Sequence, residues 1–577
     1  MKIFTGISVY PGIVIGKALL YQEDDYSEIP RYTIGQEQVE GELKRFVDAV
    51  KDTVEDLQIL KESSREMNLE QSAIFNAHLL MAEDPDFHYQ IKARLESKYE
   101  NVEWIVWEVA RDLCQKLLMS SDAYLREKAA DVSDVSRRII SFLLGVQRFS
   151  LANLAEDVVL VSRNLLLSDI LTMNKTRIKA LVMDLGSRTS HTAIFIRTFG
   201  IPSVLGLSNA VREINSGDTL IVDGEKGELI LDPDETALER YRRKLAEYSH
   251  DSDKLSALSR LPAETKDHHR VVLRANIELP EEAGDLERCG AEGIGLYRSE
   301  FLFMGSGKAA EEERQYLAYS QVIKTMKGKP VTIRTVDVGG DKILPGLPRN
   351  DEINPLLGWR AIRFSLALPE MFKTQLRAIL RASTEGPVKI MFPMISGIEE
   401  LEQALAVLEE AKAECRRKGQ PYSDNIEVGT MIEIPAAVVT ADILAEKSDF
   451  LSIGTNDLVQ YTLAVDRGNE RVSYLAQPTH PAVLRFIKQT IDAAHHRGIK
   501  AVMCGEFAGD PKAAALLLGM GLDEFSMAAI SLPQIKNIIR GVNMADCKAL
   551  ALKALACTSF KQVDALVESW MAEHFGS

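Results

Sequence analysis

Residues 262–577 alternate between strand-like and helix-like segments, and this alternation limits the fold more than any other feature of the chain. Apolar runs of strand length recur there, and helical periodicity fills most of the intervals between them. The runs are VVLRANI, GIGLYR, VTIRTVD, VKIMFPM, IEVGTMIEI, FLSIGTND, KAVMCGE and LDEFSM. Eight strand–helix units in this length predict a closed (β/α)8 barrel. An open, doubly wound sheet is the competing fold.

Polar side chains stand at or just after the ends of several of these strands. They are Arg298, Arg334, Asp337, Glu433, Asn456, Asp457 and Cys504. A lone charge is costly inside a buried strand, so this many polar residues at strand ends are hard to explain by packing alone. Because the active residues of a (β/α)8 barrel lie at the carboxyl ends of its strands, we predict that these side chains share one rim.

The residue types on the predicted rim indicate the ligand. Arginines such as Arg298 and Arg334 hold phosphate and carboxylate groups through paired N–H donors. The carboxylates of Glu433 and Asp457 suit Mg²⁺, a hard ion that completes its shell with substrate oxygens and water. The rim is therefore predicted to bind a small phosphorylated acid together with Mg²⁺.

A second candidate site is His191, in the stretch DLGSRTSHTAIFIRTFG. Thr189 or Ser190 can cap a helix that begins here, which places His191 in its first turn. The positive end of the helix dipole disfavours an imidazolium and favours an anion, and Arg188 adds a cation nearby. A neutral imidazole is nucleophilic, so we predict that it accepts a phosphoryl group. A capping histidine without a chemical role is the alternative.

The rest of the chain divides by its periodicity. Residues 1–22 are predicted to form short strands around a turn, and 33–146 carry apolar residues at helical spacing throughout. From residue 155, the runs EDVVLVS, IKALVMD and DTLIVDG predict a small α/β unit around His191. The charged stretch 233–261 shows no strong apolar face, which predicts a solvent-exposed linker helix.

Composition excludes several classes of function. The net charge is −16 and no Lys/Arg block occurs, which disfavours nucleic-acid binding. No uncharged apolar stretch is long enough to span a bilayer, and the start MKIFTGISVYPG is not a signal peptide, so we expect no direct membrane insertion. The six cysteines lack CxxC spacing, which argues against a zinc site or a disulfide framework and indicates a reducing cytoplasm.

Many motifs, in order from about Ile7 to the C-terminal helices, closely resemble enzyme I of the bacterial sugar phosphotransferase system. They include GSRTSHTAI, GLYRSEFLFM, RTVDVGGDK, NPLLGWRAIRF, MIEIPAA, FLSIGTNDLVQYTLAVDRGNE and MCGEFAGD. The resemblance implies transfer of a phosphoryl group from phosphoenolpyruvate to the chain's own histidine, with release of pyruvate. It then implies transfer to a histidine-containing phosphocarrier protein.

The resemblance also assigns roles and domains. His191 matches the phosphorylated histidine and Cys504 the donor of a proton to the enolate, while Glu433 and Asp457 match the Mg²⁺ ligands. The substrate-binding positions are Arg298, Arg334, Asn456, Asp457 and Arg467. The implied domains are a swivelling phosphohistidine α/β domain (1–22 and 147–232), an inserted helical carrier-docking domain (23–146), a linker helix (233–261) and a phosphoenolpyruvate-binding barrel (262–577) that forms a homodimer. The segment AIFNAHLLMAEDP resembles part of the docking surface.

Two positions depart from the pattern of the family. Ser187 replaces a glycine, and Ile170 stands where a threonine hydrogen-bonds the second nitrogen of the active imidazole. Isoleucine can neither donate nor accept, so the tautomer must be held otherwise, for which Thr172 and Ser168 are the nearby candidates.

Two other functions compete with this prediction. An ATP-using relative of the pyruvate phosphate dikinase type needs a nucleotide-binding domain, and residues 23–146 are helical and lack a glycine-rich loop. A regulatory paralogue would bind phosphoenolpyruvate or the carrier without turnover. Ile170 favours that possibility and the complete set of rim residues opposes it.

Overall fold

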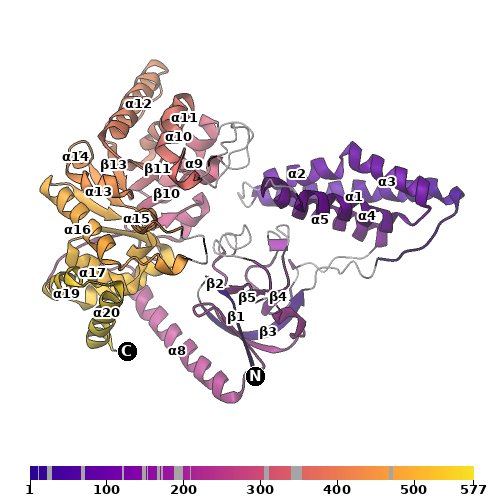
Figure 1. Ribbon diagram of the computed structural model, residues 1–577, viewed down its shortest axis with the longest axis horizontal. Helices are drawn as coiled ribbons and strands as arrows, with labels where there is room; N and C mark the ends of the chain where they lie inside the picture. The colour runs from indigo at the N-terminus through magenta and orange to yellow at the C-terminus, as the bar shows by residue number, and fades with distance from the viewer. Residues whose placement is uncertain are drawn as a thin grey trace. The chain divides into compact units, whose positions relative to one another are not determined.

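The computed structural model describes residues 1–576, apart from 11, 22–28, 67–71, 120–122, 146–150, 153, 166–168, 171–172, 187–195, 197–198, 208, 304–310, 340–351, 353, 467–468 and 470–471. Its backbone divides into two compact units, Met1–Ser249 and His250–Ser577. Figure 1 shows both units.

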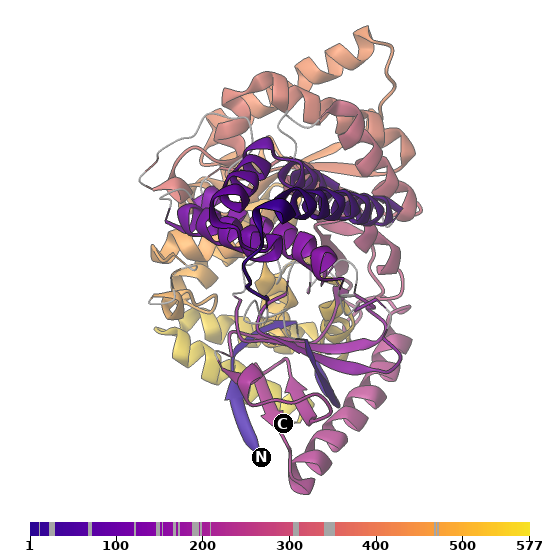
Figure 2. The same cartoon turned by 90° about the vertical axis from the view of Figure 1, so that its right-hand side faces the viewer.

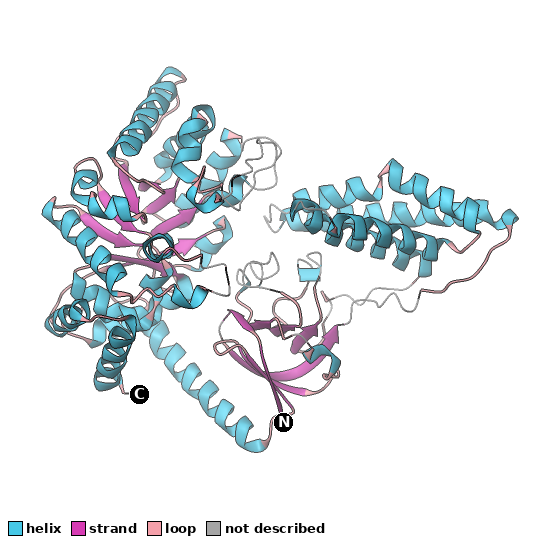
Figure 3. Ribbon diagram, in the orientation of Figure 1, coloured by secondary structure: helices cyan, strands magenta, loops and turns pink. Residues whose placement is uncertain are grey.

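The second unit contains a closed barrel of parallel strands (Figure 3). The strands are β9 (Val272–Ile277), β10 (Ile294–Arg298), β11 (Val331–Arg334), β12 (Val388–Phe392), β13 (Glu427–Ile432), β14 (Phe450–Ile453), β15 (Lys500–Met503) and β16 (Glu524–Ala528). Each strand pairs with the next along the chain, and β16 pairs with β9 to close the ring. This closure confirms the predicted (β/α)8 barrel and excludes the open sheet.

Helices surround the barrel and bury their apolar faces on its outer surface. They are α9 (Glu312–Thr325), α10 (Ala361–Ala367), α11 (Pro369–Ala382), α12 (Ile398–Arg417), α13 (Pro435–Val439), α14 (Ala441–Ala445), α15 (Thr455–Leu463), α16 (Pro481–His496), α17 (Pro511–Met520), α18 (Leu532–Gly541), α19 (Met544–Ala556) and α20 (Phe560–Phe575). A separate buried cluster comprises Leu296, Met391, Met431, Phe450, Val502 and Cys504. These residues belong to, or directly follow, barrel strands, so Cys504 belongs to a packed core.

The first unit contains a mixed sheet. Its strands are β1 (Lys2–Thr5), β2 (Ile7–Tyr10), β3 (Ile13–Tyr21), β4 (Val158–Ser162), β5 (Ile178–Met183), β6 (Ser203–Leu205), β7 (Thr219–Asp223) and β8 (Glu228–Leu231). Their order across the sheet is β1-β8-β7-β3-β4-β5-β6-β2, with β3, β4, β5 and β6 parallel to one another. The sequence patterns predicted short strands within 1–22, where β1, β2 and β3 lie, and they predicted β4, β5 and β7. They did not indicate β6 and β8, which have only three and four residues.

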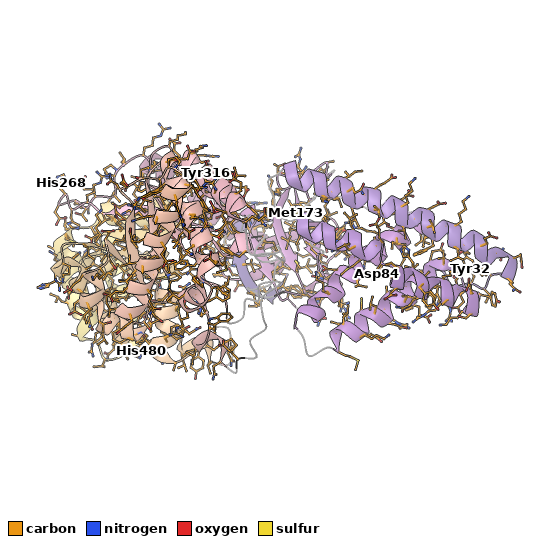
Figure 4. The ribbon with its side chains drawn as sticks, turned by 90° about the horizontal axis from the view of Figure 1, so that it is seen from above. Tyr32, Asp84, Met173, His268, Tyr316 and His480 are labelled. Atoms are coloured by element: carbon orange, nitrogen blue, oxygen red, sulfur yellow. The ribbon has the colours of Figure 1, made fainter. Side chains whose placement is uncertain are left out.

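A helical block is inserted between β3 and β4, which are neighbours in the sheet although the chain leaves at Tyr21 and returns at Val158. The block contains α1 (Val39–Glu66), α2 (Ser72–Ala82), α3 (Pro85–Lys98), α4 (Val102–Leu118) and α5 (Ala123–Leu144). These helices pack side by side around an apolar core (Figure 2). Asp84, labelled in Figure 4, caps α3 by accepting a hydrogen bond from the Asp86 backbone N–H at 2.8 Å. The insertion confirms the predicted helical domain within an α/β domain.

Helix α8 (Glu235–Leu258) corrects one expectation. The stretch was expected to be a solvated linker, but its first part is docked on the sheet. Tyr241 is 1% exposed and packs in a cluster with Ile13 of β3 and Ile221 of β7. The Tyr241 hydroxyl also donates to the Asp223 carboxylate at 3.1 Å. Leu238 and Leu245 of α8 pack against the same cluster, and the charged residues between them hide this face from a search for an apolar stripe.

Candidate active site

The residues predicted to share a rim do lie at the carboxyl ends of the barrel strands. Arg298 and Arg334 are the last residues of β10 and β11. Glu433 follows β13 and Cys504 follows β15. Asn456 and Asp457 lie in the first turn of α15, which begins two residues after β14 ends. The parallel strands place all these ends on one face of the barrel.

Buried ion pairs of alternating charge connect this face. Arg334 Nη2 lies 2.7 Å from Glu300 Oε1, and Arg334 Nη1 lies 3.1 Å from Asp337 Oδ2. Asp337 in turn accepts hydrogen bonds at 3.0 Å from Arg360, whose Nη1 lies 3.5 Å from Asp457. Each of these side chains is at most 10% exposed, so every charge depends on its neighbours for compensation.

The charges hold the arginines in their ionised form. Burial by itself would lower the pKa of the Arg334 guanidinium, but Glu300 and Asp337 outweigh it and raise that pKa. The same balance, with Asp337 and Asp457 as the carboxylates, raises the pKa of Arg360. Two permanent positive charges therefore face the end of the barrel, as recognition of a phosphate or carboxylate requires.

Glu433 is a buried carboxyl close to the carboxylates of Asp457 and Asp337. It is 1% exposed, and its Oε1 accepts a hydrogen bond from the Met394 backbone N–H at 2.6 Å. Burial, followed by the charges of Asp457 and Asp337, raises the pKa of Glu433 to about 8. A buried carboxyl beside a carboxylate ionises readily only when a further positive charge compensates it. A divalent cation bound by oxygen atoms would supply that charge. The donor set of Glu433 and Asp457 therefore fits Mg²⁺.

Cys504 is a buried thiol, 3% exposed. Burial raises its pKa to about 11, although a hydrogen bond from Ser452 acts in the opposite direction. The group is therefore protonated at neutral pH and can act as an acid rather than as a nucleophile. The chain's other five cysteines are also free thiols, as the absence of CxxC spacing predicts.

Arg298 and Asn456 lie nearer to solvent than the ion-pair chain. Arg298 pairs with Glu278, and its side chain is 33% exposed. The Asn456 amide donates to Glu506 Oε1 at 3.3 Å and accepts from the Glu506 backbone N–H at 3.2 Å. Both side chains belong to the face formed by the carboxyl ends of the strands.

Sequence reasoning missed two members of the ion-pair chain. Glu300 follows β10 in the motif GLYRSEFLFM, and Arg360 lies in NPLLGWRAIRF. Both motifs served to identify the resemblance, but neither residue received a role. Arg360 stands at the N-terminus of α10 rather than at a strand end, so the strand-end criterion could not find it.

His191 and Arg467 lie outside the described residues, as do Ser187, Ser168 and Thr172, so the roles predicted for them stay predictions. Ile170 is described and is fully buried. It belongs to an apolar cluster with Leu160 of β4 and Ile196, five residues beyond His191. The side chain that replaces the family's threonine therefore serves as core packing.

Three family models of PEP-utilising enzymes match successive parts of the chain. The model of the PEP-utilising enzyme N-terminal domain matches residues 5–128, and that of the mobile domain matches 154–227. The model of the PEP-binding domain matches 252–544, which contains the whole barrel. A closed barrel with this rim, preceded by these two domains, defines a phosphoenolpyruvate-utilising enzyme.

Individual relatives identify the family to which the chain belongs within this class of enzymes. The chain is 42% identical over 571 residues to a phosphoenolpyruvate-protein phosphotransferase of Haemophilus influenzae, covering 99% of each chain. It is 41% identical over 573 residues to the protein of that name from Staphylococcus carnosus, again covering 99% of each. The Priestia megaterium protein of that name is 42% identical and covers 98% of this chain and 99% of its own. The chain belongs to the phosphoenolpyruvate-protein phosphotransferase family, which confirms the resemblance to enzyme I.

Proposed function

We propose that this enzyme transfers the phosphoryl group of phosphoenolpyruvate to its own His191, releases pyruvate, and passes the group to a histidine of a phosphocarrier protein. This is the first step of the sugar phosphotransferase system. One observation carries the proposal. The strand-end residues expected to recognise a phosphorylated acid lie together on a closed barrel, with a buried arginine, a cation-suited carboxyl pair and a protonated thiol.

The arginines would hold the substrate. Arg298, Arg334 and Arg467 would contact its phosphate and carboxylate, with Asn456 and Asp457 completing the binding site. Phosphoryl transfer depends more on positioning and charge neutralisation than on covalent assistance from the protein. Arg334 suits this role because Glu300 and Asp337 fix its guanidinium before substrate arrives.

Glu433 and Asp457 would hold Mg²⁺. In the described part of the chain, no group of three or more His, Cys, Asp or Glu side chains is arranged to hold a metal ion. The ion's other ligands would therefore be water and substrate oxygens, as is usual for Mg²⁺ at phosphate sites. When bound, Mg²⁺ would neutralise charge on the phosphate oxygens. Glu433 must be ionised to act as a ligand, and its raised pKa opposes this until a cation is present.

Cys504 would supply the proton that converts the enolate of pyruvate to pyruvate. The enolate forms when the phosphoryl group leaves for His191, and its methylene carbon then takes a proton. The thiol suits this step because burial keeps it protonated at neutral pH.

We assign the domains from the same resemblance to enzyme I. Residues 1–22 and 147–232 form the phosphohistidine domain, 23–146 dock the carrier, 233–261 link the halves, and 262–577 bind phosphoenolpyruvate and form a homodimer. The phosphohistidine domain would swivel, because His191 must meet both the barrel and the carrier. In the described part of the chain, no helix is long and apolar enough to cross a bilayer. We propose that the enzyme acts in the cytoplasm.

Labelled phosphoenolpyruvate tests this function. With Mg²⁺, the protein should acquire acid-labile label and release pyruvate. His191→Ala should lose the label but keep phosphoenolpyruvate binding, measured by calorimetry, because the arginines belong to the barrel. Full labelling of the variant would disprove the assignment of His191, and absence of pyruvate with the wild type would disprove the function.

A further inference from the structure

Four hydrogen bonds hold Cys504 in place, and in one of them its own S–H group donates to the carbonyl of Ile453 at 3.8 Å. The Ser452 hydroxyl donates to the Cys504 sulfur at 3.3 Å. The Asn276 side-chain amide donates to the Cys504 carbonyl at 2.9 Å, and the Cys504 backbone N–H donates to the carbonyl of Ile453 at 3.2 Å. The contacts come from β14 and β9. Strand β14 is the neighbour of β15, which Cys504 follows, and β9 lies beyond β16 on the other side. The residue is therefore held at its sulfur and at both sides of its backbone.

The register of the barrel places Ser452 at the sulfur. Strands β14 and β15 run parallel with Ile453 opposite Met503, one residue before Cys504. Side chains alternate along β14, so Ser452 shares a face with Phe450, which packs in the same buried cluster as Cys504. Ser452 is 0% exposed, so bulk water cannot satisfy its hydroxyl.

The choice of acceptor is unusual for a buried serine. Neutral sulfur is a weak acceptor, and buried hydroxyls usually find an oxygen. A thiolate carries a full charge and accepts a much stronger hydrogen bond. The Ser452 hydroxyl thus gains most when Cys504 has lost its proton.

We propose that Ser452 is a positioning residue for proton transfer by Cys504, holding the sulfur in place and stabilising the thiolate that remains. The inference rests on the proposed function. In the step concerned, the S–H bond of Cys504 breaks and a C–H bond forms at the methylene carbon of the enolate. The enolate oxygen becomes the ketone of pyruvate, and the negative charge moves from the enolate to sulfur. Water later returns the proton to the thiolate.

The charged groups around the thiol give Ser452 this importance. Arg334 on β11 and Arg298 on β10 favour the thiolate, while Glu433 after β13 opposes it. Burial disfavours the thiolate more than any of these charges. Among the described residues, Ser452 is the side chain that donates a hydrogen bond directly to the sulfur. Without it, the thiolate would lack a directed donor in a buried position.

The test follows the fate of the proton. Phosphoenolpyruvate carrying deuterium in one methylene position, turned over in tritiated water, gives a chiral methyl group if the enzyme protonates one face. It gives a racemic methyl group if the enolate is protonated in solution. In Ser452→Ala, kcat for pyruvate formation should fall about ten- to a hundredfold, the worth of one hydrogen bond to a charged group. The KM for phosphoenolpyruvate should stay unchanged and the methyl chirality should be lost.

Three further variants isolate the hydroxyl. Ser452→Thr keeps the hydroxyl and should give a chiral methyl group. Valine has nearly the shape of threonine but no hydroxyl, so Ser452→Val should behave like Ser452→Ala. Ser320→Ala removes a buried hydroxyl on α9 and should match the wild type. If Ser452→Ala does not fold, the comparison of Thr with Val decides. Equal rates and chirality in these two would overturn the inference.

The variant Cys504→Ala distinguishes failure of this inference from failure of the proposed function on which it rests. If Cys504→Ala is slow and racemic while Ser452→Ala matches the wild type, the role of Ser452 is wrong and the proposed function stands. If Cys504→Ala is itself as fast and as stereospecific as the wild type, the proton comes from elsewhere. That result would overturn both the role of Cys504 and the inference.

Discussion

Replacing Ile170 tests whether the imidazole of His191, the proposed phosphoryl acceptor, lacks a hydrogen-bond partner. Ile170 is fully buried among apolar side chains, including Ile196, just beyond the segment that carries His191. In the family pattern a threonine hydroxyl at this position holds the imidazole. Ile170→Thr restores that hydroxyl, and Ile170→Val provides a control of nearly the same shape without it.

The expected magnitudes follow from the burial of Ile170. The Val variant loses one methylene group from a packed core, about 0.5–1.5 kcal/mol of stability. The Thr variant has the same volume but carries a hydroxyl, which costs about 1–3 kcal/mol more if it stays unpaired. A bond from the hydroxyl to the imidazole offsets that cost. We therefore expect Thr to be nearly as stable as Val and to accelerate phosphotransfer by about tenfold at most, the worth of one hydrogen bond.

Two assays measure the paired outcome. Urea unfolding gives the stability of each variant, and rapid-quench labelling by phosphorylated carrier gives the rate at His191 without involving the barrel. The reasoning fails if Thr and Val are labelled at the same rate. A Thr variant that is also less stable than Val would show that the hydroxyl finds no partner, and that Thr172, Ser168 or a water already orients the ring.

Three further predictions concern the barrel and the division of the chain. Cys504→Ala should slow pyruvate formation from phosphoenolpyruvate while His191 still accepts label from phosphorylated carrier; a wild-type rate would contradict this. For Glu433, burial raises the folded pKa from 4.5 to about 8. Metal-free protein should therefore be stabilised at low pH and lose about 4 kcal/mol between pH 4.5 and 8, seen in urea unfolding of the barrel, and Glu433→Gln should not. A fragment of 1–260 keeps α8 and its docked Tyr241, so it should fold, remain monomeric and take label from phosphorylated carrier; labelling by phosphoenolpyruvate alone would disprove the two-site scheme.

The barrel strands and their polar ends were predictable because their signals are local. A buried strand shows itself as a short apolar run, and a charged residue at its end interrupts that run. Arg298, Arg334, Glu433 and Cys504 were found in this way and do lie at strand ends. The short strands β6 and β8 were missed because three or four residues carry too little periodicity to stand out.

No local sequence pattern predicted which distant segments pack against one another. Strands β3 and β4 are neighbours although the whole helical block separates them in sequence. The docking of α8 likewise depends on Tyr241 meeting Ile221 and Asp223, and these contacts are invisible in the charged stretch itself. The physical cause is the same in both cases. Which segment packs against a given strand or helix depends on the shape and polarity of a surface that exists only after folding.

The sequence by itself therefore determined the kinds of chemical groups and the element on which each lies: arginines, carboxylates and a thiol at the ends of parallel strands. Only the tertiary structure decided their state. Burial raises the pKa of Cys504 and of Glu433, because removing water destabilises the charged form of each group. Folding also brings Arg360 to Asp337 and the Ser452 hydroxyl to the Cys504 sulfur. Such pairings depend on strand register and helix position, which no single segment of the chain contains.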